Sequence, residues 1–224
     1  MIIAPEISGT SIVIVGNHNP AIFHPSWLFK HGVETEVDEE LINIEVCHSE
    51  LTRFSIGETF YHIDKDRFQI STVSAPWIQI SDKVSMIFLE ILTHTPGTAV
   101  GINRDIHFRV GSSRKRTEIG RILAPIEPWG HFGEEMNKEG GETGGMLSLS
   151  MRASEANDRY HIAKNIKIEP SVKIEGDDGI YMQANFHFSP IGEPSMADVI
   201  GVLNENFQNG INESERIFDY IMGM

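Results

Sequence analysis

The sequence predicts an α+β protein with two similar halves, which together form one broad antiparallel sheet with helices on one face. Three observations support this prediction. Segments that alternate with period two occur in both halves, each half ends in an amphipathic helical pattern, and one order of elements occurs twice. That order is strand, short helix, three-strand antiparallel meander and long helix. We place the halves at residues 1–96 and 97–224, joined as one compact pseudo-twofold unit.

The first half begins with a buried strand at 11–15, a short β-branched apolar run that ends at a Gly-Asn turn. A short helix near 25–32 would bury Trp27 and Leu28, and Gly32 would take its left-handed cap. Alternation then predicts meander strands at 41–46, 59–63 and 67–73. A helix capped by Ser81 or Asp82 follows, with apolar residues at helical spacing: Val84, Ile87, Phe88, Ile91 and Leu92.

The second half repeats this order. A strand over 100–110 precedes a short helix around 117–123 and a Gly-rich loop, 130–145. The pattern then predicts strands at 146–151, 160–174 and 180–188. The last helix begins at Ser195, which forms a capping-box pattern with Asp198, and Asn209-Gly210 is where it could kink or break.

Composition limits the classes of partner. The 224 residues include 18 Lys and Arg against 32 Asp and Glu, a formal charge of −14. Nucleic-acid binding is therefore disfavoured, because it requires local cationic density. No apolar run approaches the ~18 residues of a membrane span, so we expect no membrane partner. The N-terminus lacks the pattern of an export signal and Cys47 is the single cysteine, so we expect a cytoplasmic location.

One basic segment departs from the acidic composition. Between residues 104 and 121, six cations stand against two acids and give a local charge of +4: Arg104, Arg109, Arg114, Lys115, Arg116 and Arg121. These charges either pair with acidic residues elsewhere or form a site for an anion, a nucleic acid or an acidic partner. The planar fork of arginine suits phosphate and carboxylate groups.

Histidines provide the other candidate ligand-binding residues. His18 and His24 flank Asn19-Pro20 after the first strand, where loop side chains can converge on a ligand. His131 is followed by the carboxylates Glu134 and Glu135, three and four residues later, but the segment lacks the second histidine of a zincin helix. We expect an acidic loop there, with no metal and no cofactor. Four further histidines fall in predicted strands and would form a pH-sensitive cluster if they shared an exposed face, or would be ordinary core or surface residues: His62, His107, His161 and His187.

Catalytic motifs are sparse. Cys47 adjoins His48 at a strand end, where neighbouring side chains point to opposite faces, so a structural cysteine is favoured over a nucleophile. The sequence contains no phosphate-binding loop, dinucleotide fingerprint or nucleophile elbow. The loop 130–145 is longer than most connections, which indicates either disorder or ordering on a partner.

The chain resembles a sporadically distributed, uncharacterised family of prokaryotic proteins. The resemblance is carried by the strand 66–70 leading through Trp77 into a helix, by Val100-Gly101-Ile102-Asn103-Arg104, and by Phe207 followed by Ile211-Asn212-Glu213-Ser214-Glu215. It implies a bacterial or phage origin and assigns no residue roles. The family's patchy occurrence suits mobile elements or defence islands. In outline, the expected sheet is also similar to the saddle of the TATA-box-binding protein, but a fold does not determine a function.

Two functional hypotheses follow. The first is a non-enzymatic binding or adaptor protein that holds a protein partner through a sheet face or edge, in a defence or toxin-regulation context; the acidic charge favours a basic partner. The second is a nucleotide- or anion-binding sensor, or an enzyme, that uses the basic segment Arg104–Arg121. The sequence leaves a homo-oligomer open.

Overall fold

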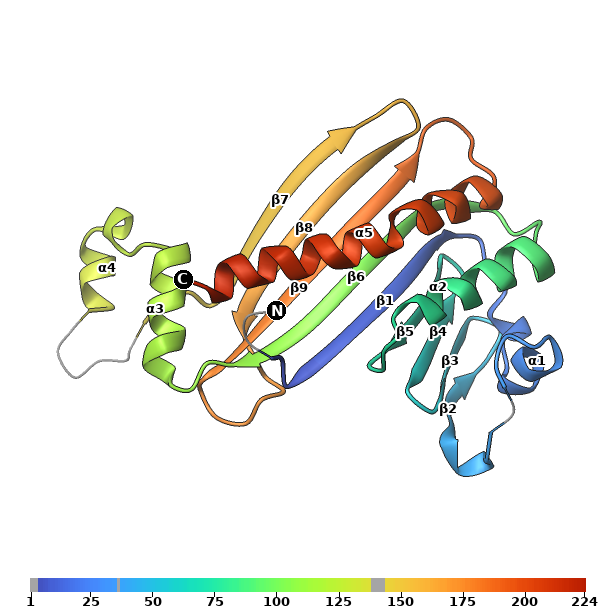
Figure 1. Ribbon diagram of the computed structural model, residues 1–224, viewed down its shortest axis with the longest axis horizontal. Helices are drawn as coiled ribbons and strands as arrows, with labels where there is room; N and C mark the ends of the chain where they lie inside the picture. The colour runs from blue at the N-terminus through green and yellow to red at the C-terminus, as the bar shows by residue number, and fades with distance from the viewer. Residues whose placement is uncertain (1–3, 36, 138–143) are drawn as a thin grey trace.

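A computed structural model describes residues 4–35, 37–137 and 144–224. Within these residues, antiparallel strands form one twisted nine-stranded sheet in the order β2-β3-β4-β5-β1-β6-β9-β8-β7 (Figure 1). The strands are β1 (Ile7–Gly16), β2 (Ile42–Cys47), β3 (Leu51–Ile56), β4 (Thr59–Asp64), β5 (Arg67–Thr72), β6 (Gly97–Arg109), β7 (Leu149–Ala156), β8 (Tyr160–Pro170) and β9 (Gly179–Pro190). The predicted α+β class and broad antiparallel sheet are confirmed.

The main helices cover one face of this sheet. They are α1 (Pro25–Lys30), α2 (Ile78–Ser85), which continues as a π-helical segment η3 (Met86–Ile91), and α5 (Met196–Met222). The helix α5 runs diagonally across the central strands, and α2 lies beside its N-terminal part (Figure 1). The hydroxyls of Ser81 and Ser85 both donate to Asn204 Oδ1, which joins α2 to α5.

Two further helices, α3 (Ser113–Leu123) and α4 (His131–Glu135), project beyond one end of the sheet (Figure 1). Short 3-10 turns complete the chain: η1 (Pro20–Ile22), η2 (Glu39–Leu41) and η4 (Glu127–Trp129). The C-terminus lies against α3, where Lys115 Nζ donates to the Met224 backbone carbonyl at 3.1 Å.

Apart from the outermost strand β2, which has no counterpart, the strand order is mirrored about the central antiparallel pair β1 and β6. Moving outward, β5 and β9 follow β1 and β6, then β4 and β8, then β3 and β7. Each central strand is the first strand of its predicted half, and β6 begins directly after the predicted boundary at residue 96. The two halves thus contribute similar elements to one sheet.

One hydrophobic cluster lies between the sheet and its helices. Its members include fully buried phenylalanine side chains from strands and helices of both halves: Phe68, Phe88, Phe108, Phe207 and Phe218. Along β1, β6 and β9 every second side chain enters this core, including Ile12, Ile102 and Phe186. The intervening side chains lie on the opposite face, which no helix of the described chain covers.

Several predicted elements need correction. The first meander has four strands, because Leu51–Ile56 pairs with both β2 and β4 and buries Thr52, Phe54 and Ile56. The helix expected at Ser81 or Asp82 already begins at Ile78, and Ser81 is buried inside it. Its second part has π-helical hydrogen bonding, with Leu92 N donating to Ile87 O at 2.7 Å.

The second half also differs in detail. The helix α3 begins four residues before the predicted start at 117, with Ser112 as its N-cap. The predicted loop 130–145 contains the short helix α4, and its residues 138–143 lie outside the described residues. The helix α5 is continuous through Asn209-Gly210, so the anticipated break is absent there. The capping box of Ser195 and Asp198 is confirmed.

Candidate functional site

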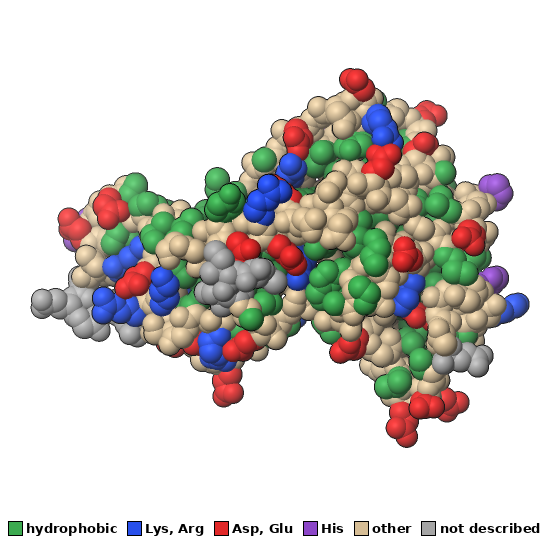
Figure 2. Space-filling view, in the orientation of Figure 1, with side chains coloured by type: hydrophobic (Ala, Val, Ile, Leu, Met, Phe, Trp, Pro, Cys, Tyr) green, Lys and Arg blue, Asp and Glu red, His purple; other side chains and the backbone are tan. Residues whose placement is uncertain are grey.

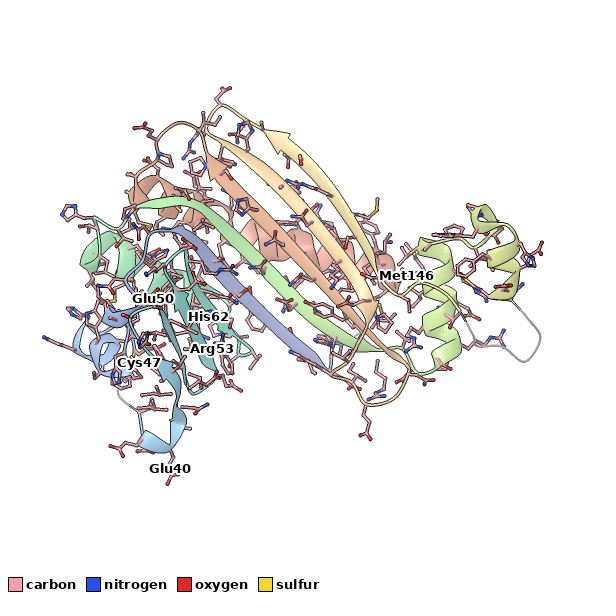
Figure 3. All side chains as sticks on the ribbon, turned by 180° about the vertical axis from the view of Figure 1, so that it is seen from behind. Glu40, Cys47, Glu50, Arg53, His62 and Met146 are labelled. Carbon is pink, nitrogen blue, oxygen red and sulfur yellow. The ribbon has the colours of Figure 1, made fainter. Side chains whose placement is uncertain are left out.

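The uncovered side of the sheet, here called the open face, is the candidate site. Figure 3 views the molecule from this side and labels His62 and Arg53 on its first half. A hollow of about 470 Å³ lies at its centre, over β5, β1, β6 and β9. Polar side chains dominate the lining: Ser11, Val13, Arg67, Gln69, Gly101, Asn103, Asp105, Gln183, Asn185 and His187.

A ladder of hydrogen-bonded side chains crosses this hollow at right angles to the strands. Antiparallel register places Ser11, Asn103, Asn185 and Asn165 opposite one another on β1, β6, β9 and β8. Asn165 Nδ2 donates to Asn185 Oδ1 at 3.2 Å, and Asn185 Nδ2 donates to Asn103 Oδ1. Asn103 Nδ2 then donates to Ser11 Oγ at 3.1 Å. Successive donors in one direction polarise each other, which makes the amide ladder stiff.

A carboxylate anchors the next row of side chains. Asp105 Oδ1 accepts from Gln183 Nε2 at 2.9 Å and from the Tyr181 hydroxyl. Burial, together with the hydrogen bond to Asp105, raises the pKa of Tyr181 well above its ordinary value, so its hydroxyl stays protonated. The His107 ring lies 4.7 Å from the Tyr181 ring, and its Nδ1 lies 2.7 Å from Ser171 Oγ.

Several cations on the open face pair with carboxylates of the same face. Arg53 contacts Glu45 at 3.6 Å, Arg67 contacts Asp64 at 3.4 Å, and Lys167 contacts Glu169 at 2.7 Å. Acidic side chains concentrate elsewhere, for example at the tip formed by the exposed η2 segment (Figure 2).

The four strand histidines all alternate with core residues and therefore lie on the open face: His62, His107, His161 and His187. They do not form one contact cluster, because β5 and β1 separate His62 from the others. Burial lowers the pKa of His62, His107 and His187. Arg152 further lowers the pKa of His187 by charge repulsion, and Lys173 does the same for His107.

The basic segment is dispersed by the fold. Arg104 points into the core side, where it is 1% exposed and contacts Glu215, the Gly9 carbonyl and the face of Trp77. Arg109 lies at the end of β6 and pairs with Glu6 and Asp178, both at 2.6 Å. These two arginines lie on opposite faces of one strand, so they cannot bind one ligand together.

The remaining cations of this segment lie on α3. Arg114 pairs with Glu118 at 3.0 Å, and Arg121 donates to the Met136 carbonyl and to Asn137. Lys115 contacts the C-terminal residue. Arg116 lines a separate pocket between α3 and the sheet.

The candidate histidines are not brought together either. His18 is buried against the rings of Phe68 and Phe88, and its Nε2 lies 3.2 Å from the Ile14 carbonyl. His24 caps α1, where its Nδ1 accepts from the Ser26 amide at 3.3 Å. His131 is exposed on α4 at the far end of the molecule, with Glu134 at 3.5 Å and Glu135 at 3.6 Å.

Cys47 lies at the end of β2 in an exposed position (Figure 3). Its Sγ lies 3.9 Å from the Phe23 carbonyl, and the Thr52 hydroxyl lies 3.8 Å away. The neighbouring His48 uses Nδ1 to accept from the Glu50 amide at 3.4 Å. This arrangement gives the thiol local structural contacts and directs the imidazole to its own turn.

The residues of the amide ladder were not among the predicted site residues. Their sequence signal is the alternation of amides and other polar residues with core residues around 103–105 and 181–187. Only the register of four strands from distant parts of the chain brings them into one row.

Across the described ranges 4–35, 37–137 and 144–224, no cluster of three or more His, Cys, Asp or Glu side chains has the arrangement of a metal site. None of the helices described has the length and apolar character needed to cross a membrane. Comparison with known proteins gives no protein-family model that matches the chain and no curated protein with significant similarity.

Proposed function

We propose that this chain is a non-enzymatic binding protein that holds an extended polypeptide segment of a partner against the open face. The amide ladder from Ser11 to Asn165 is the observation that carries the proposal. It is a preorganised row of amide and hydroxyl groups on a hollowed surface that the helices leave uncovered.

The chemistry of this row suits a polypeptide backbone. Side-chain amides carry the same N–H donor and C=O acceptor as a peptide bond, so Asn and Gln can replace the water that solvates an extended strand. Within the row, Asn185 and Asn103 each donate once and accept once and Asn165 only donates, so the amides keep further donor and acceptor capacity. Gln69, in the hollow beside the ladder, is partly exposed and adds another amide.

The charges favour a protein over a nucleic acid. Binding to a phosphate backbone requires several free cations, whereas Arg53, Arg67 and Lys167 each have a carboxylate partner on the same face. The net charge of −14 would accelerate association with a partner that is basic outside the docked segment. The resemblance to the sporadically distributed prokaryotic family favours a defence or toxin-regulation setting for such a partner.

The proposal is tested by adding charge to the open face. Gln69→Lys combined with Gln183→Lys places two ammonium groups in the hollow. These charges should repel a basic partner, and the longer side chains should prevent the backbone of the partner's segment from hydrogen bonding to the open face. The matched control is Gln208→Lys with Asn209→Lys, two exposed positions on α5 on the opposite side. All forms would be tagged, expressed in the native host and captured at low salt.

The expected result is a defined partner band with the wild type and the control pair, and its loss with the open-face pair. Loss of the partner band with the control pair alone would show that the partner binds on the helix side of the sheet. Capture of nothing by the wild type would contradict the proposal. Retention by the open-face pair would also contradict it, and would favour the exposed edge strand β7, the alternative place where a strand could be added.

A further inference from the structure

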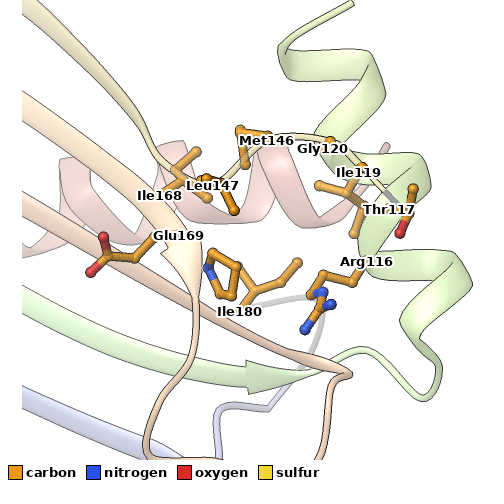
Figure 4. A pocket seen from close by; sticks show the side chains of 12 residues that line it. Arg116, Thr117, Ile119, Gly120, Met146, Leu147, Ile168, Glu169 and Ile180 are labelled. Carbon is orange, nitrogen blue, oxygen red and sulfur yellow. The ribbon is translucent and has the colours of Figure 1, made fainter. Parts of the chain in front are cut away.

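A second cavity lies away from the open face, between α3 and the ends of β8 and β9. Its volume is about 310 Å³, at the lower end of the range of about 300–1,000 Å³ for small-molecule pockets. The segment 144–147 closes one side of it (Figure 4). Its walls are mainly apolar side chains: Ile119, Met146, Leu147, Ile168 and Ile180.

Arg116 brings one charge into these walls. Its side chain reaches from α3 toward Ile180 across the pocket (Figure 4). The other basic side chains near it already have partners, as shown by the pair of Arg114 with Glu118 and the contact of Lys115 with Met224. The guanidinium of Arg116 makes no hydrogen bond or ion pair with any residue that the structure describes.

Among the described residues of the lining, Glu169 is the only carboxylate, and it does not neutralise this guanidinium. Glu169 lies on the side of the pocket opposite Arg116 (Figure 4), and its Oε2 accepts from Lys167 Nζ at 2.7 Å. As far as the described residues show, the pocket therefore combines one unpaired positive charge with an apolar cavity. A guanidinium fork binds a carboxylate through two parallel hydrogen bonds, and an apolar wall of this kind binds a hydrocarbon chain.

We propose that this pocket binds a small amphiphilic monocarboxylate, with its carboxylate on Arg116 and its hydrocarbon body against Ile119, Ile168 and Ile180. A nucleotide fits less well, because its phosphates carry several negative charges and the described lining provides one unpaired cation in a chain of charge −14. This site is independent of partner binding at the open face.

The test uses octanoate as the probe, with heat of binding measured by titration calorimetry. Acetate retains the charge without the chain, octanol retains the chain without the charge, and ATP represents the nucleotide alternative. The informative variant is Arg116→Gln. Its matched control is Arg114→Gln, which changes an exposed arginine two residues earlier on α3. Leu147→Ser probes the wall at a side chain that is 84% exposed and hence dispensable for folding.

The proposal predicts saturable binding of octanoate, with at least about tenfold weaker binding of acetate and octanol. Arg116→Gln should weaken the affinity for octanoate by about ten- to a hundredfold, in line with the loss of a charge-assisted hydrogen bond. Arg114→Gln should leave this affinity unchanged. Leu147→Ser should weaken it several-fold. Equal affinity in wild type and Arg116→Gln, no octanoate binding at all, or ATP binding that depends on Arg116 would each overturn the proposal.

Discussion

The guanidinium of Arg104 lies 3.1 Å from a carboxylate oxygen of Glu215 and thereby joins β6 to the last third of α5. The same side chain donates to the Gly9 carbonyl at 2.8 Å and stacks 4.6 Å from the ring of Trp77. Burial lowers the pKa of Arg104, and the hydrogen bond and charge of Glu215 counteract this effect. Of the two alternatives for Arg104, pairing with an acidic residue or membership of an anion site, the structure shows the pairing, and the side chain connects β1, β6, α5 and Trp77 at the start of α2.

Glu215→Ala should reduce the free energy of unfolding by about 1.5–3 kcal/mol, because it leaves a buried guanidinium without its carboxylate. Glu213→Ala is the control, since Glu213 forms only a surface pair with Arg216, and it should cost about 0.5 kcal/mol or less. Urea unfolding followed by far-UV circular dichroism measures both. Equal costs for the two variants would show that Arg104 does not depend on Glu215.

Glu34 forms a second buried junction, because its Oε1 accepts from Lys83 Nζ at 2.7 Å and from the hydroxyl of buried Tyr61. Glu34→Gln removes the carboxylate partner that Lys83 has among the described residues and should cost about 3–5 kcal/mol. The double variant Glu34→Gln with Lys83→Met removes both charges and should be more stable than Glu34→Gln alone. A double variant less stable than the single one would contradict this account of the pair.

Phe88 and Phe207 test the packing of helices on the sheet. Both side chains are fully buried, so truncation of either one to alanine should cost about 3–5 kcal/mol through lost contacts and a cavity. Phe132→Ala provides the control, because this side chain is 55% exposed on α4 and should cost about 0.5 kcal/mol or less. Unchanged melting temperatures in both core variants would refute the packing of α2 and α5 on the sheet.

Two glycines of α5 should respond in opposite directions. A Cβ on Gly201 would meet no atom within 4 Å, so Gly201→Ala should stabilise the protein by about 0.5–1 kcal/mol through helix propensity. At Gly210 a Cβ would already lie 3.3 Å from Phe186, so the larger side chain of Gly210→Leu should cost about 1–3 kcal/mol. Thermal unfolding of the two variants measures the direction of each change in stability. A destabilised Gly201→Ala would contradict the open surroundings of this position.

Stability should fall as the pH decreases from about 7 to 5, within the range where histidines titrate. The reason is that the folded-state pKa values of His18, His62, His107 and His187 are lowered, mainly by burial. Between the folded and unfolded pKa values the unfolded chain binds more protons, so acid favours unfolding. The stability that these histidines contribute is fully present above their unfolded-state pKa near 6.5, and it is lost as the pH falls through their folded-state pKa values.

His18 is the sharpest probe of this effect. With Nε2–H donating to the Ile14 carbonyl, the buried Nδ1 has no partner in the described structure, so a second proton would find no acceptor. Urea midpoints at pH 7.5, 6.5 and 5.5 should therefore fall less in His18→Leu than in the wild type. An identical pH slope in the two proteins would exclude His18 as a contributor.

The sequence predicted most elements of this fold but not their register. The strand Leu51–Ile56 was missed although Thr52, Phe54 and Ile56 alternate, because the following Gly57 favoured a turn interpretation of the region. The amide ladder depends on four strands from positions 11 to 185, and no local pattern determines how such strands align. Charge clustering in sequence was also a poor guide, because residues on one strand, such as Arg104 and Arg109, point to different faces.

Site-specific photo-crosslinking tests the role of the open face most directly. A benzophenone amino acid would replace Gln69 in the hollow, Gln208 on α5 or Met151 on the edge strand β7, and each form would be irradiated in cells of the native host. The account predicts one partner adduct from position 69 and none from positions 208 and 151. Adducts from position 208 or 151, with none from position 69, would contradict binding at the open face.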